Sequence, residues 1–144
     1  MENSSNRKRI IGSVVGTTVG LLVAFFIQQY FFKAPTFDKA MMEAASQINQ
    51  SCPIMVDQET RLDNAVAMPG NVFQYNYTLV NLVKDSIDIS GLESYIKPVI
   101  LNNVKTNPDM KGFRDNKVTM TYTYKDKDGV YITRINITPD MYEE

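Results

Sequence analysis

An uninterrupted apolar run near the start of the chain differs from the alternating patterns that follow it. Residues 10–27 (IIGSVVGTTVGLLVAFFI) carry no charge, and the basic triplet 7–9 stands directly before them. A helix of this length, at about 1.5 Å of rise per residue, comes close to the roughly 30 Å of hydrocarbon in a bilayer. The pattern predicts a transmembrane helix over 10–32, with a cytoplasmic tail at 1–9 and an extracytoplasmic domain at 33–144.

A secretory signal peptide also begins with basic residues and an apolar core. Such a signal usually ends in small residues at its cleavage site, whereas Gln28, Gln29 and Tyr30 follow this run. We therefore expect the segment to be retained in the bilayer as a single-pass anchor.

Three glycines recur every four residues within the predicted anchor. Gly12, Gly16 and Gly20 would share one helical face, which lets a second backbone approach closely. This spacing favours a helix-helix contact, either in a homo-oligomer or with another membrane protein. Glycine is also frequent in membrane helices in general, so the spacing is equally compatible with no specific contact.

Beyond the anchor, the hydrophobic pattern changes between helical and strand periods. Apolar residues at three-and-four spacing predict a helix from Thr36 to about Asn49. A second helix is expected from Ser90 toward Thr106, either kinked at Pro98 or beginning there. Two-residue alternation predicts four strands, at 60–68, 72–80, 117–125 and 130–138.

The order of these elements is helix, hairpin, helix, hairpin. Consecutive strands joined by short turns pair antiparallel, and both helices need an apolar surface to cover. We therefore expect an α+β fold with two layers, in which the helices pack on one face of a four-stranded antiparallel sheet.

Composition excludes several classes of function. The chain has no histidine and one cysteine, which excludes a Ser-His-Asp triad, a Cys-His pair, a histidine zinc site and an intrachain disulfide. The net charge is −1, and no basic cluster offers a surface for nucleic acid. We accordingly expect no metal, no cofactor and no nucleic-acid partner.

The stretch from Cys52-Pro53 through Asp57 to Thr60-Arg61-Leu62 resembles a pattern found in small bacterial exported or membrane-anchored proteins. The resemblance extends over about 41–137. It implies a bacterial cell envelope and a domain of unknown function, and it carries no catalytic residues.

Polar residues gather where the first predicted helix meets the sheet. Cys52, Asp57, Arg61 and Asp63 could form a binding corner in which Arg61 receives an anionic group. The favoured alternative pairs Arg61 with one of the two aspartates. Cys52 is expected to be buried as a small apolar residue, although it could also pair with another chain.

The polar side of the predicted sheet is a second candidate surface. Neutral hydrogen-bonding side chains over several strands could receive a glycan, a peptide or a protein, although they are also typical of a solvated sheet face. Alternation places on this side Gln74, Asn76, Thr78, Thr119, Thr121, Thr123, Arg134 and Asn136.

The sequence therefore indicates a non-enzymatic, membrane-anchored module that acts in interaction or assembly in the bacterial envelope. Its expected partners are the lipid bilayer and another envelope or membrane protein. The alternative is a small enzyme or redox-active protein that uses Cys52 with Asp57 and Arg61, where a carboxylate or lysine would have to replace histidine as the base.

Overall fold

The computed structural model describes residues 36–143. The anchor predicted at 10–32, with Gly12, Gly16 and Gly20, lies outside the described residues and stays a prediction. Within the described range, no helix has the length and apolar character needed to cross a bilayer.

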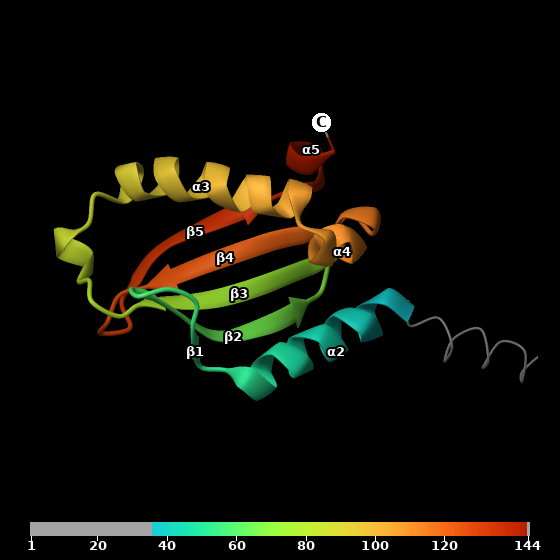
Figure 1. Ribbon diagram of the computed structural model, residues 1–144, viewed down its shortest axis with the longest axis horizontal. Helices are drawn as coiled ribbons and strands as arrows, with labels where there is room; N and C mark the ends of the chain where they lie inside the picture. The colour runs from blue at the N-terminus through green and yellow to red at the C-terminus, as the bar shows by residue number, and fades with distance from the viewer. Residues whose placement is uncertain (1–35, 144) are drawn as a thin grey trace, which may run out of the picture. The chain divides into compact units, whose positions relative to one another are not determined.

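Five strands form a single mixed sheet in the order β1-β2-β3-β4-β5 (Figure 1). The strands are β1 (Ile54–Met55), β2 (Thr60–Met68), β3 (Val72–Leu79), β4 (Thr119–Lys125) and β5 (Tyr131–Ile137). The helices are α2 (Thr36–Ser51), α3 (Ile89–Thr106), α4 (Lys111–Asp115) and α5 (Pro139–Tyr142), with short 3-10 turns at Lys84–Ser86 and Pro108–Met110.

The α+β class is confirmed, but the prediction of a four-stranded antiparallel sheet is wrong. β3 and β4 pair in parallel, and β1 adds a fifth strand beside β2. The long connection between β3 and β4 contains α3, which carries the chain back so that β4 starts at the same end of the sheet as β3. The two predicted hairpins, β2 with β3 and β4 with β5, are present.

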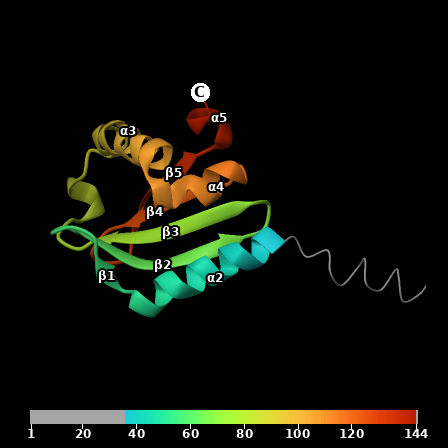
Figure 2. The same cartoon turned by 45° about the vertical axis from the view of Figure 1, so that its right-hand side comes forward.

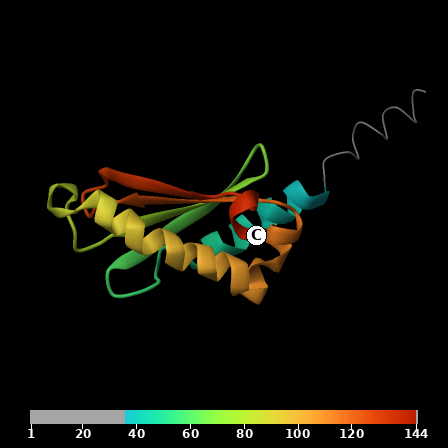
Figure 3. The ribbon, with the colours of Figure 1, turned by 90° about the horizontal axis from the view of Figure 1, so that it is seen from above.

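All helices lie on one side of the sheet, and the other side is open (Figure 3). α2 lies along the β2 side and α3 along the β5 side (Figures 1 and 2). The core between the layers contains side chains that are almost completely inaccessible to solvent, because apolar residues at alternating strand positions face the helices. The largest of these are Phe73, Met120, Ile137, Val104 and Val118.

The start of the second helix is now defined. α3 begins at Ile89 and runs through Pro98, so the alternative that it begins at Pro98 is wrong. The Glu93 carboxylate on α3 accepts a hydrogen bond from the Thr133 hydroxyl of β5. The C-terminal residues form α5, where the buried Tyr142 donates a hydrogen bond of 2.9 Å to the Val118 carbonyl.

The outer edge of β2 is closed by more than β1. β1 pairs with two residues of β2, and β2 is irregular just beyond them, between Leu62 and Asn64 in its ladder with β3. The side-chain amide of Asn49 on α2 then donates to the Ala65 carbonyl at 2.8 Å and accepts from the Ala65 amide at 2.7 Å. Asn49 thus occupies the backbone groups that a further strand would use.

Replacing Asn49 with alanine removes both of these hydrogen bonds. We expect the Asn49→Ala variant to lose about 1–2 kcal/mol of unfolding free energy, measured by urea denaturation. The exposed neighbour Gln50 provides a matched helical control. If Asn49→Ala and Gln50→Ala were equally stable, Asn49 would not support the sheet edge.

Candidate functional site

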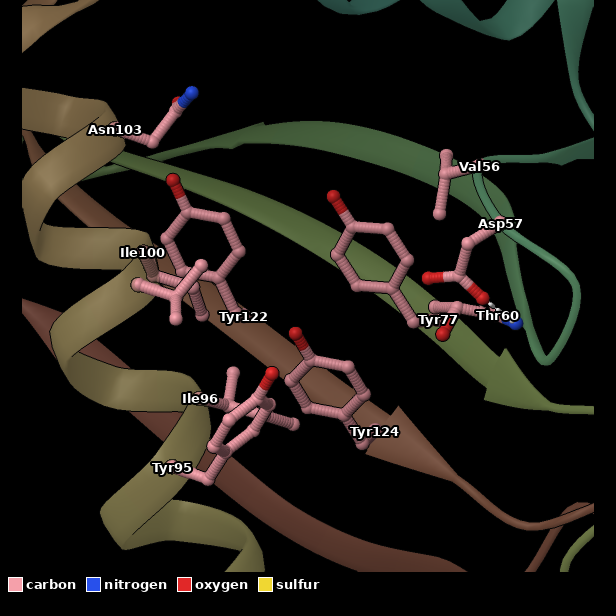
Figure 4. A pocket seen from close by; sticks show the side chains of 11 residues that line it. Val56, Asp57, Thr60, Tyr77, Tyr95, Ile96, Ile100, Asn103, Tyr122 and Tyr124 are labelled. Atoms are coloured by element: carbon pink, nitrogen blue, oxygen red, sulfur yellow. Dashed lines mark hydrogen bonds between the residues drawn. The ribbon is translucent and has the colours of Figure 1, made fainter.

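A groove of about 550 Å³ lies between α3 and the sheet (Figure 4). One wall is α3, through Tyr95, Ile96, Val99, Ile100 and Asn103. The floor consists of Tyr77, Tyr122 and Tyr124. The opposite wall consists of Val56 and Asp57 in the loop after β1 and Thr60 at the start of β2. Segments far apart in the sequence therefore meet at this groove.

Four tyrosines form a stacked cluster under the groove. The parallel register sets Tyr75 beside Tyr122 and Tyr77 beside Tyr124. Ring centroids in both pairs are 5.3 Å apart, with planes inclined by 22° and 17°. Because the ring faces cover one another, the cluster presents mainly ring edges and hydroxyl groups to the groove, and Figure 4 shows the hydroxyls of Tyr77, Tyr122 and Tyr124 pointing the same way.

These hydroxyls stay protonated over an unusually wide pH range. Burial raises the pKa of Tyr75 to about 12. Burial, with a contribution from the Asp57 charge, raises the pKa of Tyr124 to about 12. The pKa values of Tyr77 and Tyr122 are raised further, chiefly by burial and then by neighbouring tyrosines.

Within residues 36–143, none of the four hydroxyls makes a hydrogen bond, and no buried side-chain polar atom lacks a partner. The four hydroxyls are therefore reachable from solvent. Each can donate and accept a hydrogen bond, which makes the groove floor polar at points within an otherwise aromatic surface.

The walls of the groove expose large apolar side chains. Tyr95 is 75% exposed, Val99 58% and Val56 53%. Clustered exposed apolar residues in a monomeric domain are typical of a surface that another molecule covers.

Asp57 is the one charged residue among the described residues that line the groove. Its carboxylate accepts hydrogen bonds from the backbone amides of Glu59 at 2.8 Å and Thr60 at 2.7 Å. The Glu59 amide in particular lowers the pKa of Asp57, against a smaller opposing effect of burial. The groove thus keeps a negative charge at this wall at neutral pH.

The predicted binding corner is divided between two surfaces. Arg61 pairs with Asp63 at 2.7 Å, as the favoured alternative predicted, and Asp63 also accepts a 2.5 Å hydrogen bond from the Thr78 hydroxyl. This group belongs to the open side of the sheet, since Arg61 stands opposite Thr78 in the β2–β3 ladder. Asp57 alone reaches the groove.

Cys52 is half-buried and does not line the groove. Burial, with a smaller contribution from the Asp63 charge, raises the pKa of its thiol. Both effects disfavour the thiolate, which is the nucleophilic form. This environment counts against the alternative of a Cys52-dependent enzyme.

The polar residues predicted to share one side of the sheet do so on the open face. Gln74 bonds to Asn76 at 2.8 Å, and Asn76 bonds to Asn64 at 2.7 Å. On the other half of the face, Thr121 bonds to Asn136 at 3.0 Å, and Arg134 makes a longer contact of 3.4 Å to Thr123. These residues bond to one another, and Thr121 and Thr123 are buried beneath their neighbours. A binding role for this face stays a prediction.

The sequence analysis identified the strands and the helix that border the groove, and it missed the groove itself. Two signals were present. Tyrosines at i and i+2 recur in both Tyr75–Tyr77 and Tyr122–Tyr124. In α3, the apolar pairs at 95–96 and 99–100 make a stripe wider than one buried face requires.

Among the described residues, no group of acidic or cysteine side chains is suited to a metal ion.

The raised tyrosine pKa values predict a loss of stability at alkaline pH. Unfolded tyrosine titrates near pH 10, so the unfolded chain releases these protons before the folded chain does. The contribution of these tyrosines to the free energy of unfolding is complete below about pH 10 and is lost as the pH rises toward 12. Urea denaturation midpoints measured from pH 8 to 11.5 should therefore fall. The Tyr75→Phe/Tyr124→Phe variant should flatten this dependence, whereas Tyr131→Phe at the exposed Tyr131 should leave it unchanged; equal slopes would contradict the assignment.

The environment of Cys52 predicts slow alkylation. We expect iodoacetamide at pH 8 to modify the folded chain severalfold more slowly than free cysteine, because less thiolate is present. Asp63→Asn should accelerate the reaction by removing the nearby negative charge, with Asp57→Asn as the matched control. Alkylation as fast as that of free cysteine would show a reactive thiol and revive the enzyme alternative.

Three solved structures of other bacterial proteins share this fold at low sequence identity. A Pseudomonas aeruginosa protein described as secreted aligns with a TM-score of 0.62 and 10% identity, over 72% of this chain and 90% of its own. The pilotin of the type II secretion system of Vibrio vulnificus aligns with a TM-score of 0.59 and 9% identity, over 74% and 92%. The corresponding Vibrio cholerae pilotin gives 0.53 and 12%, over 72% and 90%. At these identities, the likeness shows a common fold.

The family comparison is more direct. A comparison with curated proteins finds no match. Residues 36–132, from the start of α2 into β5, match a family described as a domain of unknown function, DUF8479. This agrees with the class of domain implied by the resemblance, whereas the motif around Cys52 stays a prediction. Because the match covers well over half of the sequence, the chain belongs to the DUF8479 family.

Proposed function

We propose that residues 36–143 form a non-enzymatic interaction module of the bacterial envelope that assembles with another envelope protein through the groove between α3 and the sheet. The observation that carries this proposal is the exposure of Tyr95 and Val99 beside a floor of unpartnered tyrosine hydroxyls. The shared fold with type II secretion pilotins supports an envelope assembly role.

The chemistry of the groove favours an apolar segment of a protein as its occupant. Aliphatic side chains of the partner would cover Val99 and Val56, and polar groups of the same segment would bond to the tyrosine hydroxyls. A basic residue would sit beside Asp57, whose negative charge is the one fixed charge among the described lining residues. We therefore commit to a partner segment that is apolar on one side and carries a lysine or arginine at one end.

Two other occupants fit less well. A glycan would need open aromatic faces to stack on, whereas the tyrosine faces cover one another. A small substrate would require a nucleophile or a general base in the groove. Asp57 could act only as a weak base, because its pKa is lowered by the Glu59 amide.

The apolar run at 10–32 would anchor this module to the cytoplasmic membrane and hold it outside the cytoplasm. The anchor would restrict the search for a partner to the membrane surface, which raises the effective concentration of an otherwise modest interface. The glycine face of the run would offer a separate contact for homo-oligomers.

Equal exposure makes Val99 and Met42 a matched pair for testing the groove. Both are 58% exposed, but Met42 lies on α2 and away from the groove. With the full tagged chain crosslinked in bacterial membranes, we expect Val99→Arg to reduce the specifically captured envelope protein by about tenfold or more, as loss of one central contact does. Met42→Arg should capture as much as the wild-type chain.

A charge reversal tests the predicted basic residue of the partner. Asp57→Lys should weaken the same capture, and a compensating acidic substitution in the captured segment should restore it. The groove is not the binding surface if Val99→Arg and Met42→Arg retain the partner equally. An enzyme would be indicated if Val99→Arg left capture intact while Cys52→Ser abolished the phenotype.

A further inference from the structure

The two edges of the sheet are treated differently. β1 pairs with the first part of the β2 edge, and β2 is irregular between Leu62 and Asn64. Farther along, the side chain of Asn49 bonds to both backbone groups of Ala65. β5, at the opposite edge, has seven residues and no proline; its ladder to β4 is irregular only at the start, between Tyr124 and Lys125, and is regular from Thr133 to Ile137. Protein sheets usually protect a long exposed edge with such devices, because unpaired backbone groups are a template for another strand.

The free side of β5 has no backbone partner within residues 36–143. Its ladder runs only to β4, and none of the hydrogen bonds outside the regular elements reaches 131–137. The backbone of α3 lies toward the inner face of the sheet (Figure 3). A hollow of about 330 Å³ separates part of α3 from this edge, and it is lined by Glu93 and Lys97 of α3 and by Arg134 and Asn136 of β5.

We propose that the β5 edge pairs antiparallel with the β5 edge of a second copy of this chain, so that two sheets become one. Within residues 36–143, the sheet has one unpaired edge, β5, and one protected edge, β2. When two β5 edges pair with each other, no unpaired edge is left and assembly stops at two copies. Growth into a fibre would also need the β2 edge, where Asn49 occupies the backbone groups of Ala65.

The side chains of β5 suit a twofold register centred on Ile135. In such a register, Arg134 stands opposite Asn136 of the partner subunit on the open face of the sheet. The guanidinium of Arg134 can then donate to an amide oxygen. A register centred on Arg134 would place two like charges opposite each other, which is unfavourable.

Cysteine trapping tests this register directly. In a Cys52→Ser background, full chains carrying Arg134→Cys and chains carrying Asn136→Cys are given different tags and mixed in detergent micelles with a mild oxidant. Mixed disulfide dimers should exceed homodimers severalfold, because directly opposite positions are about 4.5–5.5 Å apart at Cβ and diagonal ones about 7–8 Å. Equal yields of mixed and like dimers, or no dimers, would overturn the proposal.

Charge variants give a second measurement that does not depend on oxidation. Asn136→Glu should lower the dimer dissociation constant by roughly threefold to tenfold, and Asn136→Arg should raise it by a similar factor, as measured by sedimentation equilibrium. Asn64→Arg, an exposed position on the same face but on β2, is the matched control. If neither Asn136 substitution changed the dissociation constant, the dimer would form through another surface, for example the glycine face of the anchor, and the proposal would be overturned.

Discussion

The backbone ladder between β3 and β4 runs parallel from Val72 and Thr119 to Thr78 and Lys125, and this register decides where the groove lies. It brings two i, i+2 tyrosine pairs side by side as a stacked cluster. It also requires a crossover, and α3 supplies that crossover together with one wall of the groove.

The chemistry of the groove is that of a recognition surface. Burial raises the pKa values of its tyrosines, so they stay neutral well above physiological pH, and its single described charge, Asp57, is held ionised by backbone amides. The cysteine lies elsewhere, in surroundings that favour the thiol. These groups can hold an apolar and partly basic segment in place, but they supply no activated nucleophile.

Membership of a family without an assigned function leaves the sites to be argued from geometry. The fold is shared with pilotins, and the same small sheet presents two surfaces that differ in kind. The groove exposes side chains, whereas the β5 edge offers backbone hydrogen bonds. A module with both surfaces can assemble with itself at one edge while its groove stays available for another protein.

Local features of the fold could be predicted from the sequence, because they depend on neighbouring residues. Alternation located β2 to β5 and separated the inner tyrosines from the outer Gln74, Asn76 and Thr121, and helical spacing located α2 and α3. Other features depend on contacts between residues far apart in sequence, so no local pattern indicates them. They are the short strand β1, the hydrogen bonds of Asn49 to Ala65 and the contact of Glu93 with Thr133. Whether β4 ran parallel or antiparallel to β3 was likewise decided only by tertiary packing, since both pairings bury the same alternating face and only the path of α3 across the sheet distinguishes them.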